Sequence, residues 1–428
     1  MSLKFGREEK FLIMTDNDLD MCILIRESLF PDGAAKVESA EAGSTSVGQA
    51  REGIRECDWQ SLFQEMQAQA ITALPYHFLQ AHPLSDQALY KQWMVVCERR
   101  KARWLQIMFA QSELIRLLEK HGIPSVILKG MSAAMAYPDP MLRTCGDIDI
   151  MVKRKDFQEA SKLLQENGYE LESHNDAMHH YGFKKDGISF ELHKRLAIVQ
   201  ERDEALLSLF EDGIDRKQKQ SIEGFSFYSL PMDLNGLVLL FHINQHLRSG
   251  LGLRQIIDWM MYVDRNRNLE QLMPLLEQTG QKKLALTVTL MCQKYLGLSK
   301  AWADSIQDSY WIESDLPCDE LMDYILEKGN FGKKSGVEGK TASVFLVESN
   351  PLRFFKRLQV GGKARWKAAK KHKMLRPFAW IYGAGFAARQ LISHRVSPAK
   401  LRRAHYKGLN QRELIQRLGL SIDRKIRI

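Results

Sequence analysis

Residues 146–152, with the sequence GDIDIMV, decide the fold expected for this chain. The segment predicts a β-strand, in which successive side chains point to opposite faces. Asp147 and Asp149 therefore share one face, while Ile148 and Ile150 turn the other way into a core. Two adjacent carboxylates repel each other unless a cation lies between them. Because Mg²⁺ is usually held by one or two carboxylates together with substrate phosphates, the pair predicts a metal and a phosphorylated substrate.

Two neighbouring segments extend this prediction. The apolar run at 126–128 predicts a buried strand that ends in a turn at Lys129-Gly130. A glycine there lets backbone amides approach phosphate oxygens, and the helix expected directly after it adds a favourable dipole. Residues 187–193 alternate between apolar and polar positions and put Glu191 on the polar face of a second strand. We therefore expect three carboxylates to converge on one face of a sheet.

The remaining sequence is mostly helical by its apolar spacing, so the fold class expected is mixed α+β, a small sheet with flanking helices between N- and C-terminal helical regions. The run Gly329 to Gly336 predicts a linker. We predict five units: 1–121, an N-terminal helical region; 122–200, the α/β core; 201–328, a helical domain; 329–350, a linker; and 351–428, a basic and mostly helical tail.

Composition limits the class of protein. The chain has 428 residues, enough for two or three domains, with 45% hydrophobic and 26% charged residues, as in an ordinary globular protein. Its six cysteines show neither C-x-x-C pairs nor metal-ligand spacing, which argues against disulfides and structural zinc. No run approaches the ~20 apolar residues of a membrane span, and no signal peptide is recognisable. A cytoplasmic location is expected.

The charge is distributed unevenly. The formal net charge is +9, yet residues 351–428 hold 21 Lys and Arg against only Glu413 and Asp423. An apolar, aromatic run at 377–386 lies between Arg376 and Arg389. We expect this tail to meet an anionic membrane surface, peripherally at the inner face, or a nucleic acid, or else to pack on the acidic body.

Several short motifs together resemble one known family. They are Leu128-Lys129-Gly130, Tyr137-Pro138, Arg143, Gly146-Asp147-Ile148-Asp149 and Glu191-Leu192-His193. The pattern resembles the bacterial uncharacterised nucleotidyltransferase-like family of the DNA-polymerase-β-like nucleotidyltransferase superfamily. The resemblance is specific over about 122–196 and looser across the helical region. The superfamily pattern has Gly-Ser at the first turn, whereas this chain has Lys-Gly, so the usual serine contact to phosphate is missing.

The resemblance implies a Mg²⁺- or Mn²⁺-dependent nucleotidyltransferase. Asp147, Asp149 and Glu191 would be the catalytic, metal-binding carboxylates, and Glu191 would also help to deprotonate an acceptor hydroxyl. An in-line attack on the α-phosphorus of a nucleoside triphosphate such as ATP would release pyrophosphate. The acceptor would be a small molecule, a peptide or a polymer.

The resemblance also implies that the turn binds the phosphates. Gly130 would cradle the phosphate chain, while Lys129 and Arg143 would neutralise its charge. Arg143 has a structural alternative, an ion pair with an aspartate that stabilises its loop. His193 would be a neighbour of the site.

Other interpretations stay open. A nucleotide-sugar donor would use the same metal and diphosphate contacts but transfer the sugar. A non-catalytic module that binds a nucleotide or a partner, and a nucleic-acid-modifying enzyme, are further alternatives. His242 and His246 are expected to have a core or interface role, and Arg254 and Asp258 to form an i,i+4 helix pair.

Overall fold

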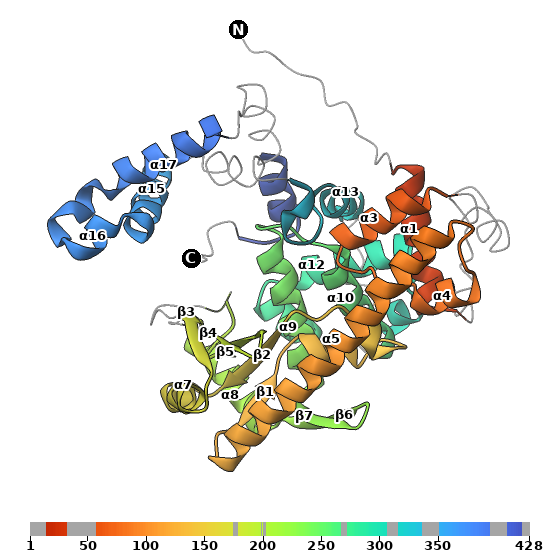
Figure 1. Ribbon diagram of the computed structural model, residues 1–428, viewed down its shortest axis with the longest axis horizontal. Helices are drawn as coiled ribbons and strands as arrows, with labels where there is room; N and C mark the ends of the chain where they lie inside the picture. The colour runs from red at the N-terminus through yellow and green to blue at the C-terminus, as the bar shows by residue number, and fades with distance from the viewer. Residues whose placement is uncertain are drawn as a thin grey trace, which may run out of the picture.

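The structure is a computed structural model that describes most of the chain (Figure 1). The residues described are 14–31, 57–173, 179–197, 199, 203–266, 272–305, 316–335, 351–393 and 409–421. The fold is mixed α+β, as the sequence predicts, with helices around one larger and one smaller sheet.

A five-stranded mixed sheet forms the centre of the predicted α/β core. Its spatial order is β1-β2-β5-β4-β3. The central strands β2 and β5 run parallel, while the other neighbours are antiparallel. The strands are β1 (Ser125–Ile127), β2 (Asp147–Val152), β3 (Glu170–Ser173), β4 (His180–Lys185) and β5 (Ile188–His193). Short helical segments near these strands are α6 (Gly130–Ala134), η2 (Pro140–Leu142) and η3 (Arg154–Asp156).

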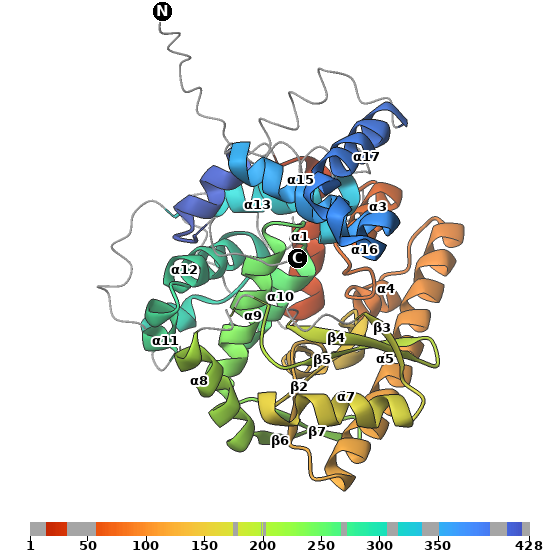
Figure 2. The same cartoon turned by 90° about the vertical axis from the view of Figure 1, so that its left-hand side faces the viewer.

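One face of this sheet is apolar and covered by two helices. Ile148 and Ile150 of β2 and Phe190 of β5 pack with buried side chains of α5 (Gln87–Lys120) and α7 (Phe157–Glu166). Figure 2 shows α7 beside the strands. The alternation of β2 and β5 leaves their polar side chains on the opposite face. The sheet is therefore closed by a core on one side and presents its acids on the other.

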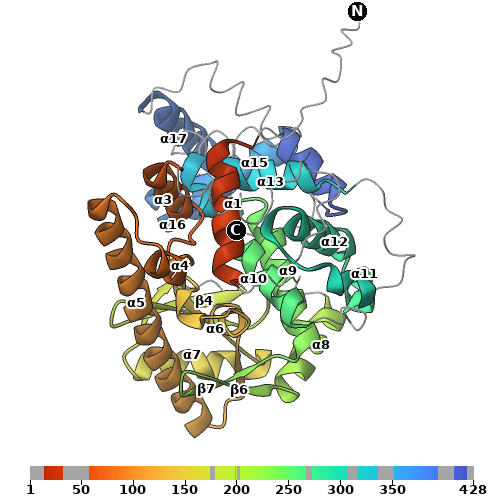
Figure 3. The same cartoon turned by 90° about the vertical axis from the view of Figure 1, so that its right-hand side faces the viewer.

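The N-terminal helices share a core with the helical region further along the chain. They are α1 (Asp16–Leu29), α3 (Trp59–Ala68), α4 (Tyr76–Ala81) and the 34-residue α5. Figure 3 shows α1 between α3 and α4 on one side and the helices from α9 (Met232–His246) to α12 (Lys282–Met291) on the other. The N-terminal half of α5 packs in this core through Trp93, whereas its C-terminal half packs under the sheet through Trp104. Helix α5 thus connects the two cores.

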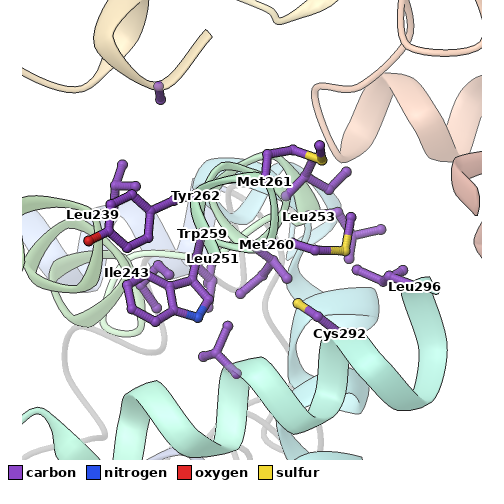
Figure 4. Close-up of a cluster of buried hydrophobic side chains, with 14 of the residues drawn as sticks. Leu239, Ile243, Leu251, Leu253, Trp259, Met260, Met261, Tyr262, Cys292 and Leu296 are labelled. Carbon is purple, nitrogen blue, oxygen red and sulfur yellow. The ribbon is translucent and has the colours of Figure 1, made fainter. Parts of the chain in front are cut away.

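The second helical region follows β5. Its helices are α8 (Glu204–Asp215), α9 (Met232–His246), α10 (Leu253–Arg265), α11 (Met273–Gln278), α12 (Lys282–Met291), η4 (Cys292–Leu296), η5 (Lys300–Ser305) and α13 (Cys318–Lys328). Figure 4 shows the centre of their core, where Trp259 and Met260 of α10 lie near Ile243 of α9 and Cys292. Most side chains of α9 and α10 are buried, so packing in the core fixes the position of both helices.

The structure differs from two predictions about this region. Residues 201–328 are not wholly helical, because β6 (Gln218–Ile222) and β7 (Phe225–Ser229) form an antiparallel hairpin. Its two-residue turn has φ of 47° at Glu223 and 80° at Gly224, and positive φ at both positions matches the twist of a hairpin. The start of the predicted linker 329–350 is instead fixed, since η7 (Asn330–Ser335) packs against the connection between α9 and α10, while residues 336–350 lie outside the described residues.

The basic tail has two described parts. A helical hairpin consists of α15 (Pro351–Arg365), α16 (Lys367–Lys371), η8 (Lys373–Phe378) and α17 (Ala379–Ser393). A last helix over 409–417 brings Leu414 and Leu418 into the core of the helical region. Among the helices in the described residues, none combines the length and apolar character needed to cross a bilayer.

Candidate functional site

The parallel pairing of β2 with β5 brings two of the predicted carboxylates together. Asp149 lies directly opposite Glu191 in the register of the two strands. Asp149 is buried, Glu191 is partly buried, and Asp147 is exposed at the start of β2. Because positions 147 and 149 lie on the same side of the pleat, all three acids are on the face opposite the core formed with α5 and α7.

His193 bridges the two opposed carboxylates. Its Nε2 lies 2.9 Å from Oδ1 of Asp149 and 3.2 Å from Oε2 of Glu191. Burial disfavours the charged ring, but the hydrogen bonds to both carboxylates outweigh it and raise the pKa of His193 to about 9. His193 is thus an imidazolium at neutral pH that draws the acids together.

Lys129 supplies a second positive charge. Its Nζ lies 2.8 Å from Oδ1 of Asp149. Burial disfavours the ammonium, but the charges of Asp149 and Glu191 outweigh this effect and raise the pKa of Lys129 above its usual value. Burial would also raise the pKa of Asp149, yet Lys129 and His193 hold it well below its usual value. The buried aspartate is therefore ionised.

The backbone of the Lys129-Gly130 turn has an unusual conformation, which places Lys129 against Asp149. Lys129 has φ of 37° and ψ of −140°, a conformation that residues with a side chain seldom adopt, and Gly130 follows with φ of 41°. A Cβ added at Gly130 would meet no atom within 4 Å. The turn thus directs the Lys129 ammonium to the acids and leaves open space beside the next residue, where a ligand can approach the backbone.

The carboxylates suit a hard cation. Repulsion from Asp149 is the chief cause that raises the pKa of Asp147, so negative charge remains to be neutralised here. Ligand atoms of Asp149, Glu191 and His193 lie within 4.8 Å of one another, and so do those of His179, His180 and His193. Oxygen donors from Asp147, Asp149 and Glu191 match the preference of Mg²⁺, although Lys129 and His193 already contact Asp149.

Histidines from two other elements surround this site. His180 of β4 is opposite His193 in the sheet, and its Nε2 is 3.7 Å from Oε1 of Glu191. From α9, His242 and His246 share a hydrogen bond of 2.9 Å between their Nε2 atoms. Burial, and then the charge of Lys129, lower the pKa of His246 to about 4 and that of His242 well below its usual value. Helix α9 therefore contributes neutral imidazoles near the Lys129 turn.

Arg143 does not join the carboxylates of β2 and β5. Its Nε and Nη2 donate to the two oxygens of Asp258 at 2.8 and 2.7 Å, and both side chains are buried. Tyr137 donates to the same aspartate at 2.8 Å. The pair joins the loop before β2 to α10. The predicted helix pair of Arg254 with Asp258 is reduced to an electrostatic interaction, because the direct salt bridge of Asp258 is formed with Arg143.

Arg254 instead faces the loop that leads into β2. Its Nη1 donates to the carbonyl oxygen of Thr144 at 3.2 Å, while its Nε lacks a hydrogen-bond partner. Burial, followed by the charge of Arg143, lowers the pKa of Arg254. The i,i+4 spacing of His242 and His246 and the charge of Arg254 are visible in the sequence. Their position beside the acids depends on the packing of α9 and α10, which no local pattern reveals.

A cavity adjoins the site. It has a volume of about 230 Å³ and begins at Lys129, between α6, the β6–β7 hairpin and α9–α10. Its lining includes the polar side chains of Ser132, Gln220, Asn235 and Asn266. Such a lining suits a ligand with several hydrogen-bonding groups.

This fold and site define a nucleotidyltransferase-like protein: a small mixed sheet with acids on two adjacent parallel strands, beside a turn open to a ligand. The family model described as "Uncharacterised nucleotidyltransferase" matches residues 55–297. The chain belongs to this family, as its motifs indicate, and the membership supports a general role in nucleotidyl transfer.

Similarity to other known proteins is limited. One solved structure, an antigenic nucleotidyltransferase-like protein from Paracoccidioides brasiliensis, is similar with 16% sequence identity and a TM-score of 0.32. The match covers 49% of this chain and 97% of that one. No curated protein matches the chain.

Proposed function

We propose that the protein transfers a nucleoside monophosphate from a nucleoside triphosphate to a hydroxyl or phosphate of an acceptor, with Mg²⁺ as cofactor. The observation that carries the proposal is the alignment of Asp149 with Glu191 on parallel strands beside the Lys129-Gly130 turn. Asp147, Asp149 and Glu191 would hold the ion. When bound, it would neutralise phosphate oxygens of the donor.

The chain's own residues then have distinct roles. Gly130 leaves room for the phosphate chain at the turn, and Lys129 places a positive charge there. With a hydroxyl acceptor, its oxygen bonds to the α-phosphorus while the bond to the β-phosphate breaks and pyrophosphate leaves. Glu191 takes up the hydroxyl proton. His193 orients Glu191 and Asp149 through its two hydrogen bonds.

The cavity beside Lys129 provides space for the acceptor. Its polar lining by Ser132, Gln220 and Asn235 favours an acceptor with several hydrogen-bonding groups. Mass spectrometry after incubation with candidate acceptors and nucleotide donors identifies the reaction. Nucleotidyl transfer adds the mass of a nucleoside monophosphate, whereas transfer from a nucleotide sugar adds that of a hexose.

The binding test compares Asp147→Asn and Asp149→Asn with the wild type. Titration calorimetry with ATP in Mg²⁺ and in EDTA measures the metal-dependent part of the affinity. Asp147 is exposed, so Asp147→Asn serves as the variant least disturbing to the fold, and Glu166→Gln on the surface of α7 is the control. We expect both aspartate variants to lose the Mg²⁺-dependent affinity. If neither does, the metal assignment is wrong.

A second candidate is a non-catalytic nucleotide-binding module. The contact of Lys129 Nζ with Asp149 at 2.8 Å favours it, because an ammonium there takes a place that a metal ion would need. Under this hypothesis ATP binds equally well in EDTA, and no pyrophosphate is released with any acceptor. The same calorimetry separates the two candidates.

A further inference from the structure

The segment 329–335 is fixed tightly on the connection between α9 and α10. The amide of Phe331 donates to the carbonyl oxygen of Gly250 at 3.1 Å, and Gln255 donates to the side chain of Asn330 at 2.9 Å. A Cβ at Gly250 would lie 2.0 Å from the nitrogen of Gly332. Only glycine permits so close an approach.

This arrangement leaves the side chain of Phe331 exposed to solvent. Its side chain is 47% exposed, although the residues on either side of it are buried. Its backbone has φ of 55° and ψ of 28°, the left-handed conformation that bulky residues avoid. Strain of this kind persists where the surroundings impose it, and it concentrates at ligand sites. The fold therefore holds an aromatic ring at the surface at some cost in conformational energy.

The ring of Phe331 contacts two side chains, those of His246 and Arg254, that lie between it and the acidic site. The ring of His246 is 4.8 Å away, at an interplanar angle of 76°. The guanidinium of Arg254 is 6.0 Å from its centroid, and Arg254 reaches the backbone of Thr144, three positions before Asp147. Among the residues that the structure describes, Arg254 forms no ion pair with a carboxylate. An aromatic surface and a guanidinium that feels the charges of Asp147 and Asp258 without a direct salt bridge to either are thus adjacent at the edge of the site.

We propose that Phe331 stacks on the nucleobase of the bound nucleotide and that Arg254 binds a phosphate of the same molecule. The inference rests on the proposed function and adds a base-binding residue outside the matched residues 55–297. Stacking on an aromatic ring tolerates any base, because every base has a π face. A guanidinium binds phosphate through parallel hydrogen bonds. Phe331 therefore contributes affinity for nucleotides rather than selection among bases.

The test compares a ligand that has a base with one that lacks it. Calorimetry measures the affinity of wild type and Phe331→Ala for ATP and for inorganic tripolyphosphate, both with Mg²⁺. We expect Phe331→Ala to weaken ATP binding about 10-fold or more and to leave tripolyphosphate binding within twofold. Phe331→Tyr keeps the ring and should bind ATP like the wild type. Arg254→Gln should weaken both ligands.

The control is Phe109→Ala, which removes an exposed phenylalanine of α5 that packs edge-on against Phe225. Unchanged ATP affinity in Phe331→Ala overturns the stacking role and leaves the proposed function standing. An equal loss for both ligands in Phe331→Ala also overturns it, since the defect is then not specific to the base. A wild-type protein that binds neither ATP nor tripolyphosphate overturns the proposed function itself.

A different observation concerns the tail hairpin, residues 351–393. Its helices α15 and α17 cross so closely that a Cβ at Gly362 would lie 1.7 Å from the carbonyl oxygen of Ala379. Large apolar side chains are exposed along the hairpin: Phe355, Val360, Met374, Phe378, Ile381, Phe386 and Ile392. Figure 1 shows the hairpin at one side of the molecule. The hairpin therefore presents apolar groups that its own packing leaves uncovered.

The charge of the hairpin identifies what covers them. Residues 351–393 contain eleven Lys and Arg and no Asp or Glu. Anionic lipid headgroups complement that charge, and the acyl boundary beneath them accepts apolar side chains. Nucleic acid complements the charge as well and can stack on exposed phenylalanines, but it offers no apolar layer to cover the aliphatic side chains of Val360, Ile381 and Ile392. We infer that the tail hairpin binds the surface of an anionic bilayer.

Co-sedimentation with vesicles tests this inference on the full chain. We expect binding to phosphatidylcholine vesicles containing phosphatidylglycerol, and at least fivefold weaker binding to pure phosphatidylcholine. Phe378→Ser/Ile381→Ser should weaken binding to the anionic vesicles at least fivefold, whereas Phe109→Ser should not. No sedimentation with anionic vesicles at low salt overturns the inference. Equal binding by the double variant, or displacement from vesicles by a single-stranded oligonucleotide, overturns it too.

Discussion

The Nζ atom of Lys129 lies 2.8 Å from Oδ1 of Asp149, so the turn that opens the site is joined to its most buried acid. The aspartate is 4% exposed and its carboxylate also contacts His193. The positive charges of Lys129 and His193 therefore offset two of the three negative charges on β2 and β5. This relationship makes the lysine the residue whose removal is most informative.

Replacing Lys129 with methionine should have opposite effects with and without metal. Without Mg²⁺, the variant loses the partner of a buried carboxylate, and breaking such a pair costs about 3–5 kcal/mol. With Mg²⁺, the freed carboxylates should bind the ion more tightly than in the wild type. Thermal unfolding in EDTA and in rising Mg²⁺ measures both effects. Lys162→Met, which removes an exposed i,i+4 pair, is the control, and an equal Mg²⁺ response in all three proteins contradicts the prediction.

The ion pair between Arg143 and Asp258 should be important for stability. Arg143→Met leaves a buried aspartate unpaired and should lower the free energy of unfolding by about 3–5 kcal/mol. The double variant Arg143→Met/Asp258→Leu should lose less than the sum of the single variants, because no charge is then left unpaired. Urea denaturation measures the difference. Additive losses would show that the two side chains are not coupled.

Substitution at Gly250 should displace the segment that carries Phe331. Gly250→Ala places a Cβ 2.0 Å from Gly332 at a residue whose φ is 115°, so 329–335 must move. We expect a lower unfolding temperature and the same selective loss of ATP over tripolyphosphate as in Phe331→Ala. The matched control is Gly385→Ala in α17, where an added Cβ meets open space and alanine favours the helix by about 0.5–1 kcal/mol. If Gly250→Ala binds ATP as tightly as the wild type, residues 329–335 do not contribute to nucleotide binding.

Acid should destabilise the protein partly through His246. Its folded-state pKa is depressed from 6.5 to about 4, chiefly by burial, so the unfolded chain takes up a proton that the folded chain does not. Stability is then lost as pH falls from about 6.5 toward 4, by at most about 1.4 kcal/mol per pH unit. His246→Gln should reduce this slope. Unfolding temperatures of both proteins between pH 7 and pH 4.5 provide the measurement, and parallel curves would assign the effect to other groups.

Much of the sheet could be predicted, because the alternation of apolar and polar residues lies within each strand. The alternation around Asp147 and Asp149 and around Glu191 fixes which side chains share a face, and the motifs identify the family. The motifs predicted only that the acids share one sheet face, whereas the parallel pairing that sets Asp149 opposite Glu191 is a tertiary contact that no local pattern specifies. The β6–β7 hairpin has only a weak local signal, because its turn, Glu223-Gly224, lacks the asparagine or aspartate that marks such turns most strongly.

The remaining parts of the site depend on contacts between distant segments. The local sequence of residues 329–335 predicts a linker. In the structure the segment is held by close contacts with Gly250 and Gly252, some eighty positions earlier in the chain. Arg254 and Asp258 have the spacing of a helix pair, yet Arg143 competes for the aspartate with better geometry and burial. The ion pair of Lys129 requires an unusual backbone conformation that its neighbours in sequence do not predict.

The attachment of the chain on both sides of the tail hairpin has a consequence for proteolysis. Before the hairpin, η7 is held at Gly250, and after it Gln411 donates to the carbonyl oxygen of Leu247 while Leu418 enters the helical core. A protease cut within residues 336–408 would thus leave a nicked protein whose C-terminal fragment stays associated. The fragment would separate only on denaturation, so a protein that migrates as two bands in a denaturing gel would still elute as one species under native conditions.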